Sequence, residues 1–524
     1  MAIVGIDLGT TNSVVATLDG GQPWVIPDND DELLLPSCVG LDNDGKLLVG
    51  AYALRQFAAA PERTIKSIKR QMGTDYEAIL GEQTYSPQAI SAMILQTLKQ
   101  QAEAVLEETV TQAVITVPAY FTDAQRQATK EAGEIAGLEV LQILNEPTAA
   151  ALVFDDRSDE TETVIVYDLG GGTFDVSIVE ITGEVTEVLA SHGNNRLGGD
   201  DFDRQLQRHL IDKFQQTHGE SVPTDATVQA RLLQAAEQAK IGLSEHGFVS
   251  VREPFLVSQG TTALHLETDI SREDFEHLIT PMLKETLGAI DRALSDASME
   301  VSELDRIVLV GGSTRIPLVQ RLVEQHLPGV PLSSFEPDLC VAMGAAVQAG
   351  VLSGAEVESI LVDVVPHSLG IAVMMDAGLG MAMPGMFSTI IPRNTVIPTS
   401  RSEIYSTASE RQEKVEIEVF QGENAIAKEN VPLGSFMVEG LPPKPAGAIQ
   451  VEVTFDFDIN GILTVTATEK GKGQKESLVV NDAATGRLSS AELDQTREEI
   501  AQLFDIDVPS TVPSPRIILP NGDD

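Results

Sequence analysis

Residues 3–12 read IVGIDLGTTN, and residues 164–173 read VIVYDLGGGT. In each stretch a short apolar strand leads into an aspartate, Asp7 or Asp168, and then into small residues. Backbone N–H groups and hydroxyls can approach an anion closely where side chains are this small, so each hairpin is suited to gripping phosphate. The repetition predicts a duplicated domain that holds a nucleotide between its two halves, with both aspartates available to a hydrated metal ion.

A third strand followed by glycines makes this prediction more specific. Residues 307–315 read IVLVGGSTR. Any one of the three elements could be an ordinary turn, but three such contexts in one chain seldom agree by chance. The sequence contains neither a Walker A motif nor a GxGxxG fingerprint, which argues against P-loop and Rossmann binding. The glycine pair before Ser313 also lacks the closing glycine of a serine-hydrolase elbow.

Length and charge restrict the class of protein. A chain of 524 residues is too long for one hydrophobic core, so we expect two or three domains. The net charge of -44 argues against nucleic acid as a partner, because contacts to a phosphate backbone need clustered Lys and Arg. We interpret the acidity as a solvated surface that preserves solubility.

Apolar runs and cysteines indicate the compartment. No uninterrupted apolar run approaches the ~20 residues that cross a bilayer, and the first residues lack the basic region of a secretory signal. Cys38 and Cys340 are the only cysteines and lie far apart in the chain, so no disulfide framework is expected. We therefore expect a cytoplasmic protein with no membrane partner.

The pattern of apolar residues changes near residue 358. Up to residue 357, apolar strands alternate with amphipathic helices, which indicates α/β organisation. Residues 358–365 are predicted to be a linker, and a linker this apolar is expected to dock on another surface. From 366 to 482 the apolar period is two, and Asn460-Gly461 is a hairpin signal, so this part is expected to be an antiparallel sheet domain.

The C-terminal residues are expected to form one helix followed by a disordered tail. Ser489 and Glu492 form a capping box, which predicts one amphipathic helix within residues 483–506. Residues 507–524 are rich in proline and polar residues and are expected to be disordered.

Five short blocks resemble the signatures of the heat-shock 70 kDa (DnaK-type) chaperones. They are DLGTTNS at 7–13, ITVPAYF at 115–121, NEPTAAA at 145–151, DLGGGTFD at 168–175 and GGSTR at 311–315. The resemblance covers residues 2–482. It implies an α/β actin-like two-lobed ATPase domain at 1–357, the linker, an all-β antiparallel sandwich that binds peptides at 366–482, and one short C-terminal helix as a truncated lid. It also implies an ATP-dependent chaperone that uses ATP/ADP, Mg²⁺ and, as a further candidate, K⁺.

The resemblance implies roles around the phosphates. Asp7 and Asp168 would bind Mg²⁺ through water, and Lys69 matches the catalytic lysine of the family. An ammonium at this place can stabilise transferring charge and orient the attacking water. Glu146 and Thr173 would complete the surroundings of that water. Without the surrounding motif, Lys69 would be read as a surface lysine. The phosphates would be held by Thr10, Thr11 and Asn12 from one side and by Gly170, Gly171 and Gly172 from the other.

The adenosine side is implied in the same way. Glu237, Lys240 and Ser244 share one helical face, so they can converge on one ring and ribose. Taken singly, Glu237 and Lys240 would more simply be a helix-surface ion pair. Arg315 would be available for stacking on the base. The opposite wall would consist of Gly311, Gly312, Ser313, Arg315 and Asp338.

The sheet domain is expected to bind extended clients. An unfolded segment would contribute backbone hydrogen bonds while an apolar side chain fills a pocket. The alternating apolar residues fit an ordinary sandwich core equally well. Pro118, Arg126 and Asp363 match positions that relay the nucleotide state to the sandwich. The residues that match the peptide groove are Ile371, Met374, Tyr405, Ala408, Val415 and Ile417.

Two departures from the family pattern affect partners. Gln142 stands where an arginine commonly meets the J-domain cochaperone, so stimulation by an ordinary J-protein is in doubt. The chain has one helix where the family has a long lid, so we expect an uncovered groove with fast peptide exchange. A nucleotide-exchange factor is a further expected partner.

Other classes of function remain as alternatives. A sugar kinase or acetate-kinase-like transferase would share the phosphate hairpins, and so would a polymer-forming relative of actin. Neither has an evident use for the sheet domain at 366–482. A nucleotide-locked holdase that rarely hydrolyses ATP is the alternative within the same family.

Overall fold

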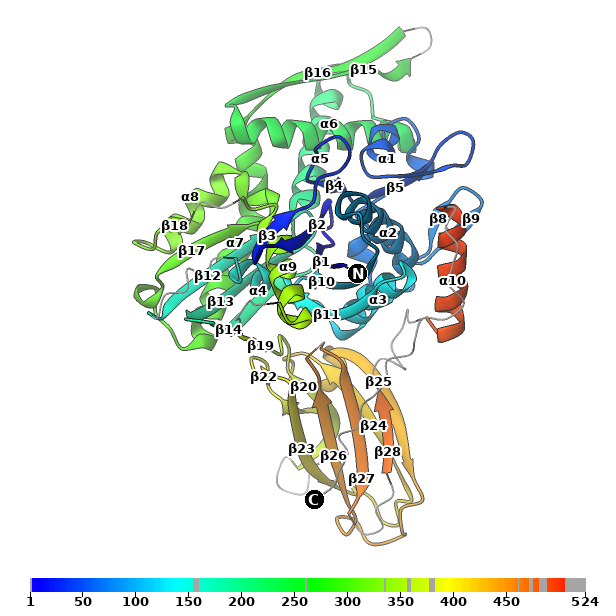
Figure 1. The fold of residues 1–524 in the computed structure, drawn as a ribbon, viewed down its shortest axis with the longest axis vertical. Coiled ribbons are helices and arrows are strands. Elements are labelled where there is room, and N and C mark those ends of the chain that lie inside the picture. Colours follow the sequence, from blue (N-terminus) through cyan, green and yellow to red (C-terminus); the bar gives the residue numbers. More distant parts are fainter. Residues whose placement is uncertain are drawn as a thin grey trace.

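The computed structural model describes residues 2–153, 160–259, 262–333, 336–355, 360–376, 382–459, 461–470, 475–479 and 488–504. Two lobes built on β-sheets lie above a β-sandwich in the orientation of Figure 1. The tail at 507–524, predicted to be disordered, lies outside the described residues.

In the first lobe, an apolar strand lies at the centre of the sheet. β1 (Ala2–Asp7) pairs in parallel with β10 (Val110–Val117) and antiparallel with β2 (Asn12–Asp19). Val4 and Ile6 on β1 are fully buried in a core that also includes residues of the flanking helices. The other elements of this lobe are β3 (Gln22–Val25), β4 (Leu35–Pro36), β5 (Cys38–Leu41), β6 (Leu47–Val49), α1 (Ala51–Gln56), η1 (Pro61–Arg63), β7 (Thr64–Lys66), η2 (Ile68–Gln71), β8 (Ala78–Leu80), β9 (Gln83–Tyr85), α2 (Pro87–Leu106), α3 (Asp123–Ile135), β11 (Glu139–Asn145) and α4 (Glu146–Ala151).

The second lobe repeats the central arrangement of the first. β12 (Glu162–Leu169) pairs antiparallel with β13 (Phe174–Thr182) and in parallel with β17 (Arg306–Val310). The same pairings surround β1, so the duplication in the sequence is also a duplication in topology. The seven-stranded sheet has the order β18-β17-β12-β13-β14-β19-β22, with β14 (Val185–Asn194), β18 (Leu332–Ser333), β19 (Ile360–Val364) and β22 (Val396–Ile397).

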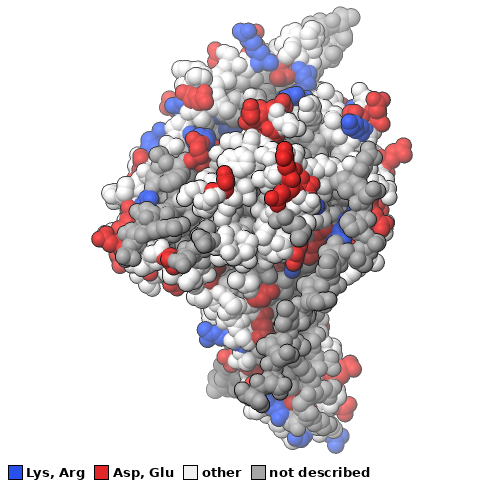
Figure 2. Space-filling view, in the orientation of Figure 1, with Lys and Arg blue, Asp and Glu red and all other residues white. Residues whose placement is uncertain are grey.

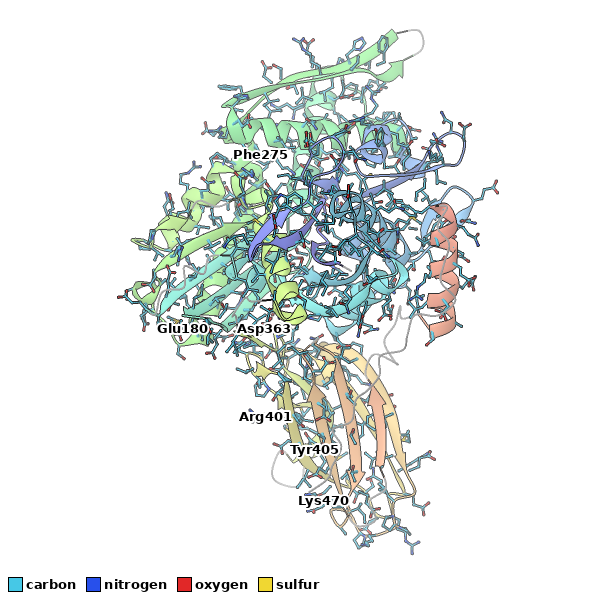
Figure 3. All side chains as sticks on the ribbon, viewed as in Figure 1. Glu180, Phe275, Asp363, Arg401, Tyr405 and Lys470 are labelled. Atoms are coloured by element: carbon cyan, nitrogen blue, oxygen red, sulfur yellow. The ribbon has the colours of Figure 1, made fainter. Side chains whose placement is uncertain are left out.

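Long helices and a hairpin complete the second lobe. Phe275 on α7, labelled in Figure 3, is buried in the core beneath the hairpin β15–β16. The helix α9 connects the lobes, because it packs on β1 of the first lobe while its Val341 and Ala345 share a buried core with Val166 of β12. It also packs closely on α4, where a Cβ on Gly344 would lie 1.7 Å from the Ala149 carbonyl oxygen. The bounds are α5 (Gly199–His218), α6 (Ala226–Glu245), β15 (Phe248–Gln259), β16 (Thr262–Ser271), α7 (Arg272–Ala297), η3 (Val301–Glu303), η4 (Gly312–Arg315), α8 (Pro317–His326) and α9 (Cys340–Ser353).

Below the lobes, two four-stranded antiparallel sheets form a sandwich. Their orders are β21-β20-β24-β25 and β23-β26-β27-β28. Alternating residues of both sheets, such as Val419 and Phe455, meet in one buried core. The turn that contains Gly461 joins β26 to β27, as the Asn-Gly signal predicts. The bounds are β20 (Leu369–Asp376), β21 (Ala382–Ile391), β23 (Thr399–Ser406), β24 (Lys414–Gln421), η5 (Ala427–Glu429), β25 (Val431–Glu439), β26 (Gln450–Phe457), β27 (Leu463–Glu469) and β28 (Lys475–Val479).

The last described helix, α10 (Ser490–Leu503), lies against the first lobe and not against the sandwich (Figure 1). The Ser489 hydroxyl accepts from the Glu492 N–H and the Glu492 carboxylate accepts from Ser489, which is the predicted capping box. Ile500 is buried in the core of the first lobe, and Arg497 donates to the Glu134 carbonyl at 3.0 Å. The apolar face of the helix is therefore covered by α2 and α3.

The surface carries charges of both signs. On the face shown in Figure 2, acidic side chains lie over the lobes and the sandwich among scattered basic ones. Within the described residues, no helix is both long and apolar enough to cross a membrane.

Candidate functional site

A cavity of about 770 Å³ lies between the two lobes. Its walls come from the two aspartate hairpins, from α6 and from η4. Among the residues predicted to surround the nucleotide, all except Gly172 line this cavity: Asp7, Thr10, Thr11, Asn12, Lys69, Glu146, Asp168, Gly170, Gly171, Thr173, Glu237, Lys240, Ser244, Gly311, Gly312, Ser313, Arg315 and Asp338. Residues from distant parts of the sequence therefore face one enclosed space.

The two hairpins lie so close together that side chains are admitted on one side only. A Cβ on Gly171 would lie 1.9 Å from the Thr11 hydroxyl oxygen, and a Cβ on Gly172 would lie 2.7 Å from Thr10. The second turn is closed by a hydrogen bond from the Gly170 N–H to the Thr173 carbonyl. Small residues are thus required here by space, and they leave backbone N–H groups near the hydroxyls of the first turn.

The floor of the cavity has more buried carboxylates than cations. Burial raises the pKa of Asp7 to about 7, and the neighbouring Glu146 adds to this shift. Burial and Glu146 also raise the pKa of Asp168 well above its usual range. Lys69 is buried, and its ammonium lies 2.5 Å from Glu146. One ammonium does not balance these acids, so the donor set fits a divalent cation with its water shell.

Asp175 is a further buried acid that the motif analysis did not assign. Burial and Glu146 raise its pKa to about 8, and its carboxylate accepts from the Tyr120 N–H at 3.0 Å. It lies within the DLGGGTFD block, so its place in the motif was visible, but its burial behind the cavity was not.

Ion pairs hold the side of the cavity that is predicted to face adenosine. Glu237 pairs at 2.8 Å with Lys66 of β7, so this pair joins the two lobes across the cleft. Lys240 pairs at 2.8 Å with Asp203 of α5. The interpretation of Glu237 and Lys240 as one ion pair along a helix surface is therefore wrong, because each binds a partner from another element.

The opposite wall of this part of the cavity is also fixed by charge. Arg315 donates to Asp338 at 2.8 Å and to Glu336 at 2.9 Å. Its side chain is half exposed at the mouth of the cavity. The Ser313 hydroxyl donates to the Gly170 carbonyl, which ties η4 to the second hairpin. This wall is held in place by bonds between residues that line the cavity, with Glu336 as an additional partner from outside the lining.

The predicted linker is a strand of the second lobe. Residues Ile360–Val364 form β19, which pairs in parallel with β14 and antiparallel with β22. Residues 356–359, where the linker begins, lie outside the described residues. Figure 3 shows Asp363 at the junction between the lobes and the sandwich.

Asp363 connects this strand to the base of the cavity. Its carboxylate accepts from the Asn145 side-chain amide at 2.8 Å and from the Thr148 hydroxyl at 3.3 Å. Arg126 donates to the Asn145 side-chain oxygen and to the Ala119 carbonyl, one residue beyond the buried Pro118. Burial raises the pKa of Asp363. Asn145 directly precedes Glu146, the partner of Lys69, so the hydrogen bonds run from the linker to the cavity.

A known protein family matches the sequence over nearly its whole length. A family model described as "Hsp70 protein" matches residues 3–81 and 77–508. The chain belongs to the Hsp70 family. Hsp70 proteins are ATPases that act as ATP-dependent chaperones, and they bind ATP or ADP with Mg²⁺. The family as a whole has two actin-like ATPase lobes followed by a β-sandwich, which agrees with the α/β part and the two packed sheets of this chain.

In this Hsp70, the residues predicted for the peptide groove do not share one exposed surface. Ile371 and Ile417 are buried in the sandwich core, as the alternative interpretation holds. Tyr405 and Val415 are partly buried, and the Tyr405 hydroxyl lies 3.0 Å from that of Ser388. By contrast, the side chains of Met374 and Ala408 are exposed.

Residues 374–386 include five methionines, and the described part of this stretch is a strand pair. Met375 on β20 lies opposite Met383 on β21, and both are exposed. Met381 lies outside the described residues.

Gln142, which stands where the family pattern commonly has an arginine, is not accessible at the surface. It lies on β11, is buried, and accepts from the Gln348 side-chain amide at 2.7 Å. In Hsp70 proteins generally, J-domain proteins and nucleotide-exchange factors are partners. A buried amide at this position offers neither charge nor an exposed donor to such a partner.

Proposed function

We propose that this Hsp70 binds extended apolar segments of unfolded proteins and that ATP binding and hydrolysis in the cleft control how tightly it holds them. The observation that carries the proposal is the bonding of β19, which continues the sheet of the second lobe while Asp363 binds Asn145 beside Glu146. A change in the cleft can therefore alter the docking of the segment that leads into the sandwich.

In the cleft, Thr10, Thr11 and Asn12 would hold the phosphates against the N–H groups of the glycine turn. Asp7 and Asp168 would keep Mg²⁺ in place through water. Bound Mg²⁺ supplies positive charge that neutralises the phosphate oxygens. The excess of buried acids over Lys69 supports this assignment.

Lys69, Glu146 and Thr173 would act on the attacking water. The Glu146 carboxylate can accept a proton from water, and it is oriented by the ammonium of Lys69 at 2.5 Å. Lys69 can also stabilise negative charge that develops on the phosphate during transfer. Asp175 lies behind the cavity and accepts from the Tyr120 N–H, so we propose it as a residue that positions this cluster and not as one that touches the nucleotide.

Coupling to the sandwich follows from the hydrogen bonds of Asp363. With the linker docked, Asn145 is held between Asp363 and Arg126, next to the catalytic Glu146. With the linker released, Asn145 and Thr148 would lose a buried acceptor, so undocking has to be offset by other interactions. Peptide and ATP must then oppose each other by one common coupling free energy.

The sandwich is proposed to open in order to bind a client. Ile371 and Ile417 are buried in the present arrangement, so they would contact a client only after the strands near Met374 and Tyr405 have moved. The exposed methionines at 374, 375 and 383 would offer a polarizable surface that tolerates varied sequences.

A peptide-release experiment tests the proposal. A labelled apolar peptide is bound to the protein, and its release is followed by stopped flow in ATP, in ADP and without nucleotide. We expect release at least about tenfold faster in ATP than in ADP. ATP turnover should rise when peptide is added. Equal affinity and lifetime under all three conditions would contradict the proposal, and nucleotide-dependent release without turnover would favour the holdase.

A further inference from the structure

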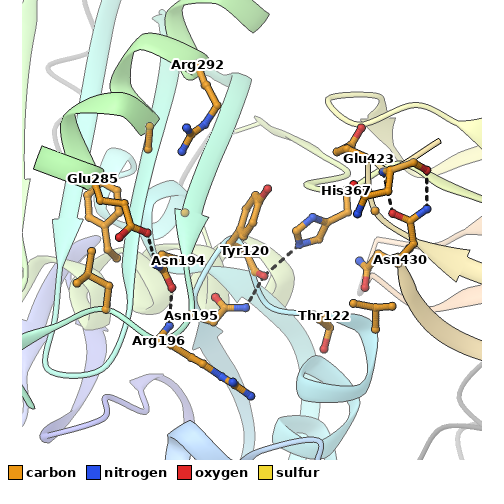
Figure 4. Close-up of a pocket in the computed structure, with 18 of the residues that line it drawn as sticks. Tyr120, Thr122, Asn194, Asn195, Arg196, Glu285, Arg292, His367, Glu423 and Asn430 are labelled. Atoms are coloured by element: carbon orange, nitrogen blue, oxygen red, sulfur yellow. Dashed lines mark hydrogen bonds between the residues drawn. The ribbon is translucent and has the colours of Figure 1, made fainter. Parts of the chain in front are cut away.

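Two histidines lie at the junction of the lobes and the sandwich. His367 precedes β20, and its Nε2 lies 3.2 Å from the Tyr120 carbonyl oxygen. A carbonyl can only accept, so Nε2 carries the proton and neutral His367 has Nδ1 unprotonated. The rings of His367 and Tyr120 meet edge to face with centroids 4.0 Å apart (Figure 4).

The second histidine at this junction is His192. It lies on β14, and its Nε2 is 2.8 Å from the carboxylate of Asp296 on α7. The same carboxylate accepts from Arg393 at 2.7 Å and from Asn394 at 3.1 Å, both in the segment that enters β22. His192 is thus part of the bonding that holds this segment of the sandwich domain to the second lobe.

The charged groups around His367 act in opposite directions on a second proton. Arg126 of α3 and His192 of β14 oppose a positive charge there, while Glu423 beyond β24 favours one. The Glu423 carboxylate already accepts from the Ser368 N–H and hydroxyl, and it lies 3.6 Å from Arg393. Among the described residues, Nδ1 of His367 has no hydrogen-bond acceptor. The groups that face His192 are Asp296, Arg292, Arg393 and Tyr120.

Burial lowers the pKa of both histidines. It lowers the pKa of His367 from 6.5 to about 4, and the Tyr120 carbonyl offsets this only in part. Burial also lowers the pKa of His192, although Asp296 opposes that shift. Hydrogen bonds from Arg393 and His192 keep the pKa of Asp296 low in spite of burial, so this carboxylate remains charged while the histidines titrate.

A cavity of about 430 Å³ beside His367 gives solvent a route to the ring. Its walls come from the first lobe at Tyr120, from the second lobe at Asn194 and Arg292, and from the sandwich at Glu423 (Figure 4). A proton can therefore reach the interface without prior unfolding of either domain.

We propose that the docking of the sandwich on the lobes is controlled by protons, with His367 as the principal sensor and His192 acting in the same direction. Acidification charges His367 more readily in the undocked arrangement, where water surrounds the ring, than in the docked one. If the proposed coupling of docking to clients holds, a fall in pH would change client binding without any change of nucleotide.

The linkage between protonation and docking gives the direction and the size of the pH effect on docking. Because the docked pKa of His367 is lowered, its contribution to docking is complete above pH 6.5 and is lost as the pH falls from 6.5 toward 4. Between pH 7.5 and pH 5.5, the docking equilibrium constant should fall by about tenfold.

Energy transfer between two dyes on the full chain measures docking directly. Cys38 and Cys340 are buried, so dyes attach selectively to introduced cysteines at Glu184→Cys in the turn before β14 and Arg401→Cys on β23, both exposed positions near the junction. Transfer efficiency is measured from pH 7.5 to 5.5, with and without excess Mg²⁺·ATP, and again after return to pH 7.5. The return step separates undocking from acid unfolding.

Three variants decide the outcome. His367→Leu and His367→Gln cannot take a proton in this range, and the glutamine keeps an N–H donor for the Tyr120 carbonyl. His246→Gln removes an exposed histidine at the end of α6 and is the matched control. We expect reversible loss of transfer on acidification in the parent and in His246→Gln, and a pH effect below twofold in whichever His367 variant docks at pH 7.5.

Other results would overturn the inference. These are a transfer efficiency that does not change with pH, an unchanged pH dependence in both His367 variants, or low transfer in the parent already at pH 7.5. Because neither peptide nor turnover is measured, failure of the proposed function would be seen separately, in the release experiment.

Discussion

The two phosphate hairpins arise from the same strand and turn but supply different chemistry. The turn after β1 carries the side chains of Thr10, Thr11 and Asn12, whereas the turn after β12 begins with three glycines at 170–172. A Cβ on Gly171 would lie 1.9 Å from the Thr11 hydroxyl oxygen, so the first turn fills the space that the second leaves free. The duplication is therefore complementary: one half presents hydroxyls and the other presents backbone N–H groups.

The largest expected effect separates turnover from binding at two residues that line the cleft, one from each lobe. Lys69→Ala and Thr173→Ala should each reduce single-turnover ATP hydrolysis by at least ~100-fold, because they remove groups placed to stabilise charge in the transition state. ATP should still bind, because the two phosphate turns are intact. Hydrolysis is measured in a single turnover and binding by calorimetry. Loss of binding with unchanged turnover at saturation would reverse the roles that we propose.

The next effect tests the complementarity itself. Gly171→Ala should weaken ATP binding by about tenfold to a hundredfold, because the added methyl group displaces Thr11 from the phosphate side. Adding Thr11→Gly to this variant frees the space and should restore part of the affinity. Gly247→Ala, at a position with no atom within 4 Å of the added Cβ, is the control. Fluorescence titration with labelled ATP gives all three affinities.

A double variant as weak as Gly171→Ala alone would mean that the close approach of the two turns does not limit binding. The hairpins would then be independent sites and not complementary halves.

The two hairpins also explain how far the sequence can be read. Each motif is local, since strand, aspartate and small residues lie within ten positions, so the cavity wall could be predicted from residue types and spacing. The strand at 360–364 was expected to dock because it is apolar, but its partner strand was not predictable from composition. Pairing with β14 depends on contacts between distant parts of the chain.

Ion pairs in the wall of the cleft were missed for the same reason. Lys66 and Asp203 bind the predicted residues Glu237 and Lys240, yet neither lies in a recognisable motif. His367 follows Pro366 in an unremarkable sequence and becomes a candidate sensor only where it meets Tyr120. The burial of Ile371 and Ile417 was likewise open, because alternating apolar residues suit a core and a groove equally well.

Asp363 extends the comparison from the cleft to the linker. Asp363→Ala should reduce the acceleration of peptide release by ATP about fivefold to tenfold, because Asn145 and Thr148 lose a buried charged acceptor. Basal ATP binding should be nearly unchanged, since Asp363 does not line the cavity. Glu410→Ala, an exposed acid in the sandwich, is the control. The measurement is stopped-flow peptide release in ATP and ADP; full acceleration in Asp363→Ala would show that the linker contacts do not transmit the nucleotide state.

The smallest effect compares two ion pairs of the cleft. Lys69 and Glu146 are buried, with side-chain exposures of 4% and 9%, whereas Lys66 and Glu237 are 18% and 17% exposed. Water screens the second pair more strongly, so its loss should cost only about 0.5–1 kcal/mol. Lys66→Ala should therefore speed ADP release by about twofold to fivefold and leave turnover at saturation unchanged.

Reversing both charges, with Lys66→Glu and Glu237→Lys together, should restore slow release if the pair acts as a bond between the lobes. Arg252→Ala breaks a pair within the outer hairpin whose side chains are 74% and 70% exposed, and it should leave ADP release as it was. Release of labelled ADP resolves these differences; a charge-reversed protein as fast as Lys66→Ala would instead assign the effect to direct contact of Glu237 with the nucleotide.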